Sequence, residues 1–371
     1  MKIHITLIGR EVLPTFYTIM EYQPDVTYLI GTNDTNESIN RISKVLRQKG
    51  IKHEVCLSLP FDAKETKNVC ERIHEQNGEE CEYIYNITGG TKPMAFGAMM
   101  CAQSHNAKLV YTDSLNCIDL ISSSQTPLKC NVDLNTIFSL QGQKLLSKDI
   151  YTYNPLRTQC AKEIRDFIKN HRGDYDVIRK EYSKFKQISR SFDSGLTHYE
   201  RGEDYISVYH GDIEVFSSDY REAYQMLFEG RWWETLVADA VNEWAGGEKE
   251  IWTSVMFEPN NNRTVQYKNG KQYIKNEIDI LVNLGNTMLF VECKSGDFMQ
   301  DNIYKLSSIC KVYGSYKSKG VIVSFYPCRP DLLEKGNDEN IEIIAPKKYC
   351  ILALDKHFNE ILTKIVKTLK V

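Results

Sequence analysis

Hydrophobic positions in the first third of the chain alternate between two periods. Short apolar runs typical of strands are separated by segments whose apolar residues recur every three or four positions, as on one face of a helix. Strands are expected at 3–9, 26–31, 53–59, 82–87 and 108–113. Helices are expected at 36–48, after Asp62 and from Pro93. This alternation predicts an α/β fold built on a parallel, doubly wound sheet.

The pattern changes twice after residue 113. Short strands and turns are expected from 117 to 143, and the next stretch is charged and rich in tyrosine, with a helix at 176–190 and a hairpin at 205–216. The remainder is again α/β. Helices are expected at 230–244, at 299–316 and from Lys356, a hairpin at 277–294 and a strand at 320–325. We therefore predict a domain at 1–145, a connector or small intermediate module at 146–218 and a second domain at 219–371.

An acidic hairpin is the most informative feature of the second domain. Residues 277–294 form two apolar runs around a Gly-Asn pair, which predicts a two-residue turn. In that register Asp279 lies opposite Glu292, and Glu277 lies opposite Lys294. All four side chains project from one face, because side chains alternate along a strand. Two opposed carboxylates repel each other, and a divalent cation relieves the repulsion because hard cations prefer carboxylate oxygens.

The alternative for this hairpin is a charged edge that faces solvent. The residues around the charges are strongly apolar, as at Ile280, Val282 and Phe290. Such a hairpin is expected at the centre of its sheet, where buried charge needs a partner or a metal.

Three loops of the first domain are expected to meet at the carboxyl ends of its strands, where doubly wound sheets bind ligands. Their glycines let backbone N–H groups approach a phosphate, and the helix after the last loop points its positive end there. Neither the Walker spacing nor G-x-G-x-x-G is present. The candidate ligand-binding residues are Gly9, Arg10, Gly31, Thr32, Asn33, Thr88, Gly89, Gly90, Thr91 and Lys92.

The formal net charge of −3 implies no domain-wide basic field, so any nucleic acid must be bound by local basic patches. The 11 cysteines form no Cys-x-x-Cys pair, and the 8 histidines form no ligand pair at helical spacing. We expect reduced, buried thiols, Cys101 and Cys350 among them. The chain begins directly with a strand and has no run of 18 apolar residues, which predicts a soluble, cytoplasmic protein.

The hairpin resembles the PD-(D/E)xK nuclease superfamily. Asp279 matches the first acidic residue of that motif, and Glu292-Cys293-Lys294 matches its E-x-K element. In many members a helix before the hairpin supplies another acid, and Glu234 fits that place, although it reads equally well as a solvated helix glutamate.

This resemblance implies a restriction-endonuclease-like second domain with a catalytic set of Glu234, Asp279, Glu292 and Lys294. The three carboxylates would bind Mn²⁺ or Mg²⁺, and Lys294 would orient a water molecule or neutralise charge. Glu277 would tether Lys294.

The segment Asn86–Met94 closely resembles the ligand loop of CARF domains, the Rossmann-like sensors of cyclic oligoadenylates in type III CRISPR systems. A CARF domain followed by a PD-(D/E)xK domain resembles the CRISPR-ancillary nucleases of antiviral defence that cyclic tetra-adenylate activates allosterically. The resemblance implies a homodimer that binds the ring on its two-fold axis, cleaves RNA and/or DNA, and has no membrane partner.

Two other functions remain open at this point. One is a ligand-independent restriction or repair endonuclease whose first domain serves oligomerisation. The other is a nucleotide-gated binding protein without activity. The sequence does not distinguish RNA from single-stranded or duplex DNA as substrate, and it fixes neither the ring size, the number of metals nor whether the first domain degrades its ligand.

Overall fold

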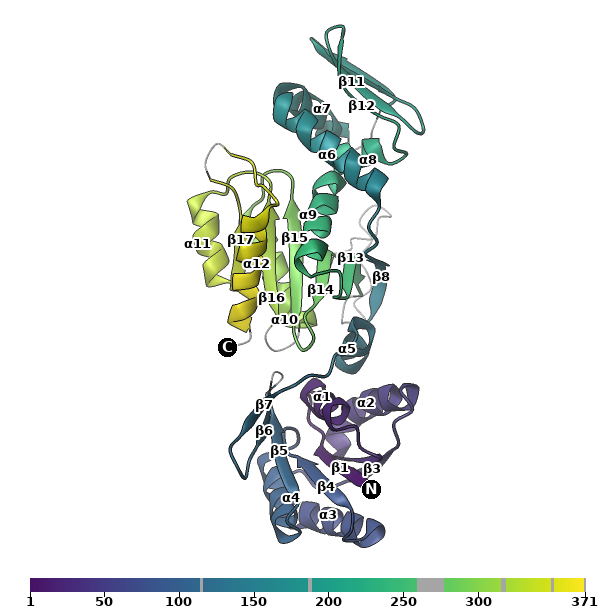
Figure 1. Ribbon diagram of the computed structural model, residues 1–371, viewed down its shortest axis with the longest axis vertical. Coiled ribbons are helices and arrows are strands. Elements are labelled where there is room, and N and C mark those ends of the chain that lie inside the picture. Colours follow the sequence, from purple (N-terminus) through teal and green to yellow (C-terminus); the bar gives the residue numbers. More distant parts are fainter. Residues whose placement is uncertain (114–115, 186–188, 259–276, 315–317, 348–349, 370–371) are drawn as a thin grey trace.

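The computed structural model describes residues 1–113, 116–185, 189–258, 277–314, 318–347 and 350–369. These residues form an elongated molecule (Figure 1) with the first domain at one end, the second domain in the middle and a small module at the other end. Among the described helices, none is both long enough and apolar enough to cross a lipid bilayer.

The first domain is built on a seven-stranded sheet of order β3-β2-β1-β4-β5-β6-β7. The first five strands are parallel and the last two are antiparallel, which confirms the doubly wound prediction. The strands are β1 (Lys2–Leu7), β2 (Val26–Gly31), β3 (His53–Leu57), β4 (Glu82–Asn86), β5 (Lys108–Thr112), β6 (Asn116–Asp119) and β7 (Gln125–Pro127).

Helices cover both faces of this sheet. They are α1 (Leu13–Tyr22), the short 3₁₀ helix η1 (Asn33–Thr35), α2 (Asn36–Gln48), α3 (Ala63–Asn77) and α4 (Lys92–Ser104). α2 has its predicted bounds, and the Asp62 carboxylate caps α3 by accepting a hydrogen bond from Glu65 N at 3.0 Å. The sequence does not predict α1, because residues 15–19 are all buried and leave no polar face to set a helical period.

Helix α5 (Leu134–Gln141) joins the cores of the two domains. It was expected to be strand or turn, but Asp133 caps it and it packs on α1 and α2. On its other side the Phe138 ring lies 5.9 Å from the Trp252 ring and 5.3 Å from the Phe257 ring. One continuous apolar cluster therefore runs from the first domain through α5 into the second.

The second domain has a six-stranded sheet of order β17-β16-β15-β14-β13-β8. Its strands are β8 (Leu145–Ile150), β13 (Ile251–Phe257), β14 (Glu277–Asn283), β15 (Met288–Lys294), β16 (Lys319–Ser324) and β17 (Ile341–Ile344). The pairing of Ile280 with Val291 confirms the predicted hairpin register. The hairpin lies inside the sheet, as its apolarity predicts. The edge strand β8 comes from before the small module, a pairing that the sequence does not reveal.

Four helices sandwich this sheet: α9 (Arg231–Trp244), α10 (Gln300–Tyr313), α11 (Pro330–Asp338) and α12 (Lys356–Leu369). α9 and α12 share a core with Val291 and Cys293, whereas α10 and α11 share one with Leu281 and Phe290. The Cys293 side chain therefore lies on the face opposite the hairpin acids.

The charged, tyrosine-rich stretch after β8 forms a module of regular structure. It contains α6 (Pro155–Asn170), α7 (Arg172–Phe185), a four-stranded antiparallel sheet and the short helix α8 (Ala223–Glu229). The strands are β9 (Ser191–Ser194), β10 (Thr197–Arg201), β11 (Ile206–His210) and β12 (Ile213–Ser218), of which the last two form the predicted hairpin. The module lies beyond the second domain (Figure 1), and α5 and β8 connect the two domains.

Candidate functional site

The hairpin acids line a cavity of about 570 Å³ in the second domain. β14 supplies Glu277 and Asp279, β15 supplies Glu292 and Lys294, and the first turn of α9 supplies Glu234. The structure therefore brings all four residues of the expected catalytic set to one place. The remaining lining residues are Ser147, Lys148, Asp149, Glu229, Arg231, Ser254, Met256 and Lys305.

Glu292 is the most enclosed acid of this cavity, with its side chain 5 % exposed. Its Oε1 accepts a 2.6 Å hydrogen bond from Lys294 Nζ and lies 3.6 Å from Lys305 Nζ. Its Oε2 is buried and has no hydrogen-bond partner within the described part of the chain. A buried carboxylate oxygen left without a donor costs free energy, so this atom is suited to a cation.

Asp279 and Glu234 line the same cavity as Glu292. Desolvation raises the pKa of Asp279 well above its ordinary value, and the charges of Glu292 and Glu234 raise it further. Desolvation also raises the pKa of Glu234 to about 7, and Arg231 opposes this rise. Asp279 and Glu234 therefore resist ionisation beside the Glu292 carboxylate.

Lys294 contacts Glu292 rather than Glu277, which corrects the tether expected from the register. Desolvation disfavours the charge on Lys294, but the neighbouring Glu292 and Asp279 outweigh it, so the pKa of Lys294 is raised. The ammonium group is therefore charged at neutral pH and lies beside the acids.

The donor set fits a hard divalent cation. Glu234, Asp279 and Glu292 line one cavity, and Glu292 Oε2 has no hydrogen-bond partner among the described residues, which matches the oxygen ligands that Mg²⁺ and Mn²⁺ prefer. The Cys293 side chain packs into the core, and its backbone N–H donates a 2.6 Å hydrogen bond to Asp279 Oδ2. This bond fixes the orientation of the Asp279 carboxylate.

The sequence does not predict three basic residues of the cavity, Lys148 on β8 among them. Lys305 comes from α10 and Arg231 from the start of α9, where it pairs with Glu229 at 2.9 Å. No short motif marks them, because the packing of α10 against β15 alone brings Lys305 to Glu292.

In the first domain, the loops after β1 and β4 touch each other. A Cβ atom added to Gly89 would lie 2.1 Å from Leu7 O and 2.8 Å from Gly9 N, so only glycine fits there. Gly90 has a φ of +74°, which also favours glycine. The third expected loop follows β2, which lies next to β1 in the sheet. The three expected ligand loops therefore share one edge of the sheet.

Several expected ligand donors instead hold these loops in shape. The Thr91 hydroxyl donates to the Pro60 carbonyl and caps α4, and the Thr88 hydroxyl accepts a 2.8 Å hydrogen bond from Thr112 N. In the loop after β2, a Cβ atom added to Gly31 would lie 2.6 Å from Ile39 Cδ1, so the glycine lets Ile39 pack there. Thr32 of the same loop is buried.

By contrast, Arg10, Asn33 and Lys92 are exposed. Their side chains are therefore available to a ligand.

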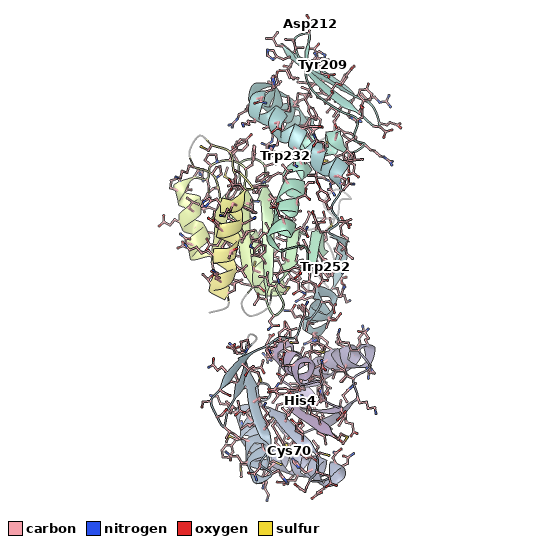
Figure 2. All side chains as sticks on the ribbon, in the orientation of Figure 1. His4, Cys70, Tyr209, Asp212, Trp232 and Trp252 are labelled. Carbon is pink, nitrogen blue, oxygen red and sulfur yellow. The ribbon has the colours of Figure 1, made fainter. Side chains whose placement is uncertain are left out.

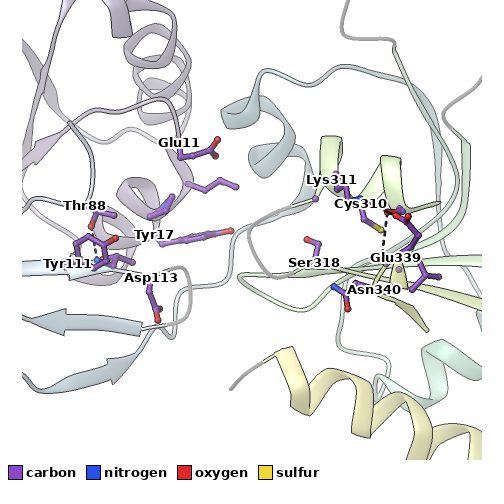
Figure 3. Close-up of a pocket in the computed structure, with 17 residues that line it drawn as sticks. Glu11, Tyr17, Thr88, Tyr111, Asp113, Cys310, Lys311, Ser318, Glu339 and Asn340 are labelled. Carbon is purple, nitrogen blue, oxygen red and sulfur yellow. Dashed lines mark hydrogen bonds and ion pairs between the residues drawn. The ribbon is translucent and has the colours of Figure 1, made fainter. Parts of the chain in front are cut away.

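A larger cavity of about 850 Å³ lies between the two domains (Figure 3). Thr88, Tyr17 and Asp113 line it from the first domain, and Lys311 and Glu339 line it from the second. Of the expected ligand residues only Thr88 reaches it. The cavity is therefore part of the interdomain junction and distinct from the acidic cavity.

Two family models match the chain, one in each domain. Residues 3–134 match the model described as the Card1 CARF domain, and residues 221–363 match the model described as the Card1-like endonuclease domain. Among curated proteins, none matches with significant similarity.

Solved structures agree with this assignment at the level of the fold. Can2 from Sulfobacillus thermosulfidooxidans, solved with cyclic tetra-adenylate, is 17 % identical with a TM-score of 0.70, covering 100 % of both chains. Protein VC1899 from Vibrio cholerae is 16 % identical with a TM-score of 0.74, covering 99 % of this chain and 98 % of its own. A type III CRISPR defence DNA nuclease activated by cyclic oligoadenylate is 14 % identical with a TM-score of 0.61, and the match covers 98 % of this chain but 51 % of that one.

Proposed function

The chain belongs to the Card1-like family, in which a CARF domain precedes an endonuclease domain, and we propose that it is a metal-dependent nuclease activated by a cyclic oligoadenylate. Its role is the hydrolysis of phosphodiester bonds in type III CRISPR defence. The observation that carries the proposal is the acidic cavity, where acids from β14, β15 and α9 meet. Within the described residues, Glu292 Oε2 in this cavity is buried and has no hydrogen-bond partner.

Asp279, Glu292 and Glu234 hold Mn²⁺ or Mg²⁺ in this proposal. When bound, the ion lowers the pKa of a water molecule and stabilises charge on the scissile phosphate. Lys294 neutralises negative charge beside the acids because it stays protonated. Lys305 and Arg231 provide the local basic patch that a chain of net charge −3 needs to attract a nucleic acid.

The activator in this proposal is cyclic tetra-adenylate, the ligand named for the Can2 structure. The Gly9, Gly89 and Gly90 backbone approaches its phosphates, with the exposed Arg10 and Lys92 as charged donors. The N-terminus of α4 adds a favourable dipole.

The active species is a homodimer that encloses the ring. Three large apolar side chains beside the ligand loop are strongly exposed: Leu59 at 57 %, Phe61 at 83 % and Phe96 at 54 %. Leu59 and Phe61 flank Pro60, which bonds to Thr91, and Phe96 lies one helical turn beyond Lys92. Exposed apolar side chains gathered at one site favour a protein interface.

The substrate is single-stranded RNA and/or DNA. A cleavage assay on single-stranded RNA, single-stranded DNA and duplex DNA, each with and without Mn²⁺ and cyclic tetra-adenylate, tests this function. We expect cleavage of at least one single-stranded substrate only with both additions. Equal cleavage without the ring would favour a ligand-independent restriction or repair enzyme, and no cleavage of any substrate would favour a nucleotide-gated binding protein.

Replacing the cavity lysine should slow the chemical step. In Lys294→Met, which keeps the aliphatic stem, we expect single-turnover cleavage to fall about 100-fold, the scale for loss of one electrostatic donor. Mn²⁺ affinity should not fall, since an ammonium group is no metal ligand. Single-turnover kinetics and calorimetry measure the two effects, with the exposed Lys364→Met on α12 as the control. A variant that loses Mn²⁺ binding but cleaves normally at saturating Mn²⁺ would contradict this role.

Metal binding should depend on pH through Glu234. Its pKa of about 7 means that protons compete with the cation as the pH falls below neutrality. We expect Mn²⁺ affinity to drop roughly tenfold between about pH 8 and about pH 6, because the ligand must be ionised to bind. Calorimetry at both pH values measures the affinity. Glu234→Gln should reduce the dependence, and Asp279, whose pKa is also raised, accounts for the remainder. An affinity independent of pH in the unaltered protein would remove Glu234 from the ligand set.

A further inference from the structure

Two cysteines and two histidines gather between α3 and α4 of the first domain. Cys70 and His74 are four residues apart on α3, and Cys101 and His105 are four apart at the end of α4. Residues at this spacing share one helix face, and the two helices pack together. Ligand atoms of His74, Cys101 and His105 lie within 4.8 Å of one another.

Cys70 lies one helical turn before His74 on α3, and the neighbouring Cys101 thiol raises the pKa of the Cys70 thiol. The Tyr85 hydroxyl lies 2.9 Å from His74 Nε2 and donates to Cys101 Sγ at 3.3 Å. The His74 and His105 rings stack with their centroids 3.8 Å apart. The four side chains therefore form one compact cluster.

One atom of this cluster lacks the partner that its burial demands. His74 is 2 % exposed, yet its Nδ1 has no hydrogen-bond partner among the residues that the structure describes. A buried ring nitrogen without a partner is costly. Burial also lowers the pKa of His74 to about 4, so the ring is neutral at pH 7 and has a lone pair to offer.

We propose that Cys70, His74, Cys101 and His105 form a binding site for a transition-metal ion, with Zn²⁺ as the best match. Two thiolates with two imidazoles are a common ligand set of structural zinc sites, and soft sulfur ligands disfavour Mg²⁺ and Mn²⁺. Glu71 fits the same site, because its Oε2 lies 2.7 Å from His105 Nε2. A histidine that binds a metal through one nitrogen usually donates its other N–H to a carboxylate.

Metal binding requires a small rearrangement of the side chains. Zn²⁺ holds sulfur and nitrogen ligands at about 2.0–2.3 Å, so the ligand atoms must contract around the ion. The stacked His74 and His105 rings must also turn until their lone pairs converge, and His105 exchanges its weaker 3.3 Å contact with the exposed Glu79 for the metal. Both thiols lose a proton on binding, which makes the affinity fall at low pH.

A bound ion would link α3 to the C-terminal end of α4. The first residue of α4 is Lys92 of the ligand loop. The site lies in the first domain at the end of the molecule remote from the second domain, as the position of Cys70 shows (Figure 2). The ion would therefore be structural and would stabilise the first domain.

Cobalt substitution tests the site directly on the full-length protein, prepared without chelators or a histidine tag. We expect stoichiometric Zn²⁺ by elemental analysis. After exchange with Co²⁺ we expect the visible bands of a tetrahedral ion and a sulfur-to-cobalt charge-transfer band. Cys101→Ser and His105→Asn should each lose these bands, and His105→Asn keeps the test valid if the buried Cys101→Ser unfolds. Cys160→Ser, which alters a buried thiol elsewhere, and Asp279→Asn should keep them.

Three results would overturn the proposal. The first is a protein that holds no Zn²⁺ and gives no charge-transfer band with Co²⁺. The second is a band that survives in Cys101→Ser and His105→Asn or disappears in Asp279→Asn, which would place the ion elsewhere. The third is a Cys70–Cys101 disulfide in freshly prepared protein under non-reducing conditions, since oxidised sulfur cannot bind the ion.

Discussion

Asp279→Asn and Glu292→Gln should each reduce nucleic-acid cleavage by about 100-fold or more, the scale on which single electrostatic groups act in catalysis. The physical reason is that both acids line one cavity, where Glu292 Oε2 is buried without a hydrogen-bond donor among the described residues and is open to a cation. Each change should also weaken Mn²⁺ binding. Binding of cyclic tetra-adenylate should stay unchanged, because its proposed site lies in the other domain. Single-turnover assays measure cleavage, and calorimetry on the same preparations measures the binding of Mn²⁺ and of cyclic tetra-adenylate.

Asp279→Asn should not destabilise the metal-free protein, whereas Glu292→Gln also breaks the buried ion pair with Lys294. In Asp279→Asn, removing one of two opposed carboxylates relieves cross-strand repulsion, and we expect a gain of up to about 1 kcal/mol in the free energy of unfolding. Glu342→Gln, which alters a half-exposed carboxylate on β17 of the same sheet, is the matched control and should leave cleavage intact. Full activity in both cavity variants would overturn the assignment of the site.

Gly89→Ala should nearly abolish activation by cyclic tetra-adenylate while leaving the acidic cavity intact. The added Cβ would lie 2.1 Å from Leu7 O, a backbone atom that cannot move aside alone, so the two loops must separate. Overpacking of this kind costs about 1–3 kcal/mol. If that cost falls on the ring-bound loop conformation, affinity drops roughly 5- to 150-fold.

A matched glycine makes the comparison sharp. Gly173 on α7 has open space where its Cβ would stand and an ordinary φ, so Gly173→Ala should change nothing. Lys92→Ala in the same ligand loop should weaken ring binding by about 1.5–3 kcal/mol for each charge-assisted hydrogen bond lost. Ring titrations that coincide for Gly89→Ala, Lys92→Ala and the unaltered protein would show that residues 88–92 form only a structural turn.

Local patterns in the sequence predict the parts of the molecule that local chemistry determines. The hairpin register follows from the Gly-Asn turn and the alternation of strand faces, and α2 follows from a clear apolar stripe. The sequence does not predict the close contact between Gly89 and Leu7 O, because this contact depends on how β1 and β4, which are distant in the chain, lie side by side.

Elements without a local apolar period or a nearby partner strand are not predictable in this way. α1 is buried along consecutive residues, and β8 pairs with a strand about a hundred residues later, so neither has a local period or partner to reveal it. The Cys–His cluster also escapes patterns of paired cysteines or paired histidines, because each helix contributes one residue of each type. Of the two cysteines expected to be buried, Cys101 is buried, but Cys350 is exposed.

The continuous core between the domains gives a physical route for activation. α5 packs on α1 and α2 and presents Phe138 to β13, while the backbone N–H of Leu134 donates to Glu250 at 2.8 Å. If bound cyclic tetra-adenylate shifts the first domain, these contacts must move or become strained. The ligand favours the active state only by binding that state more tightly. We place the coupling at α5 rather than in the module at 151–218.

The most direct test of the central claim is to measure cleavage rate and ring occupancy together across one titration with cyclic tetra-adenylate at saturating Mn²⁺. The account predicts that the rate is near zero without the ring, rises in proportion to occupancy, and saturates when one ring is bound per two chains. A rate that stays the same from empty to saturated protein, or a protein that binds no cyclic oligoadenylate while cleaving nucleic acid, would contradict it.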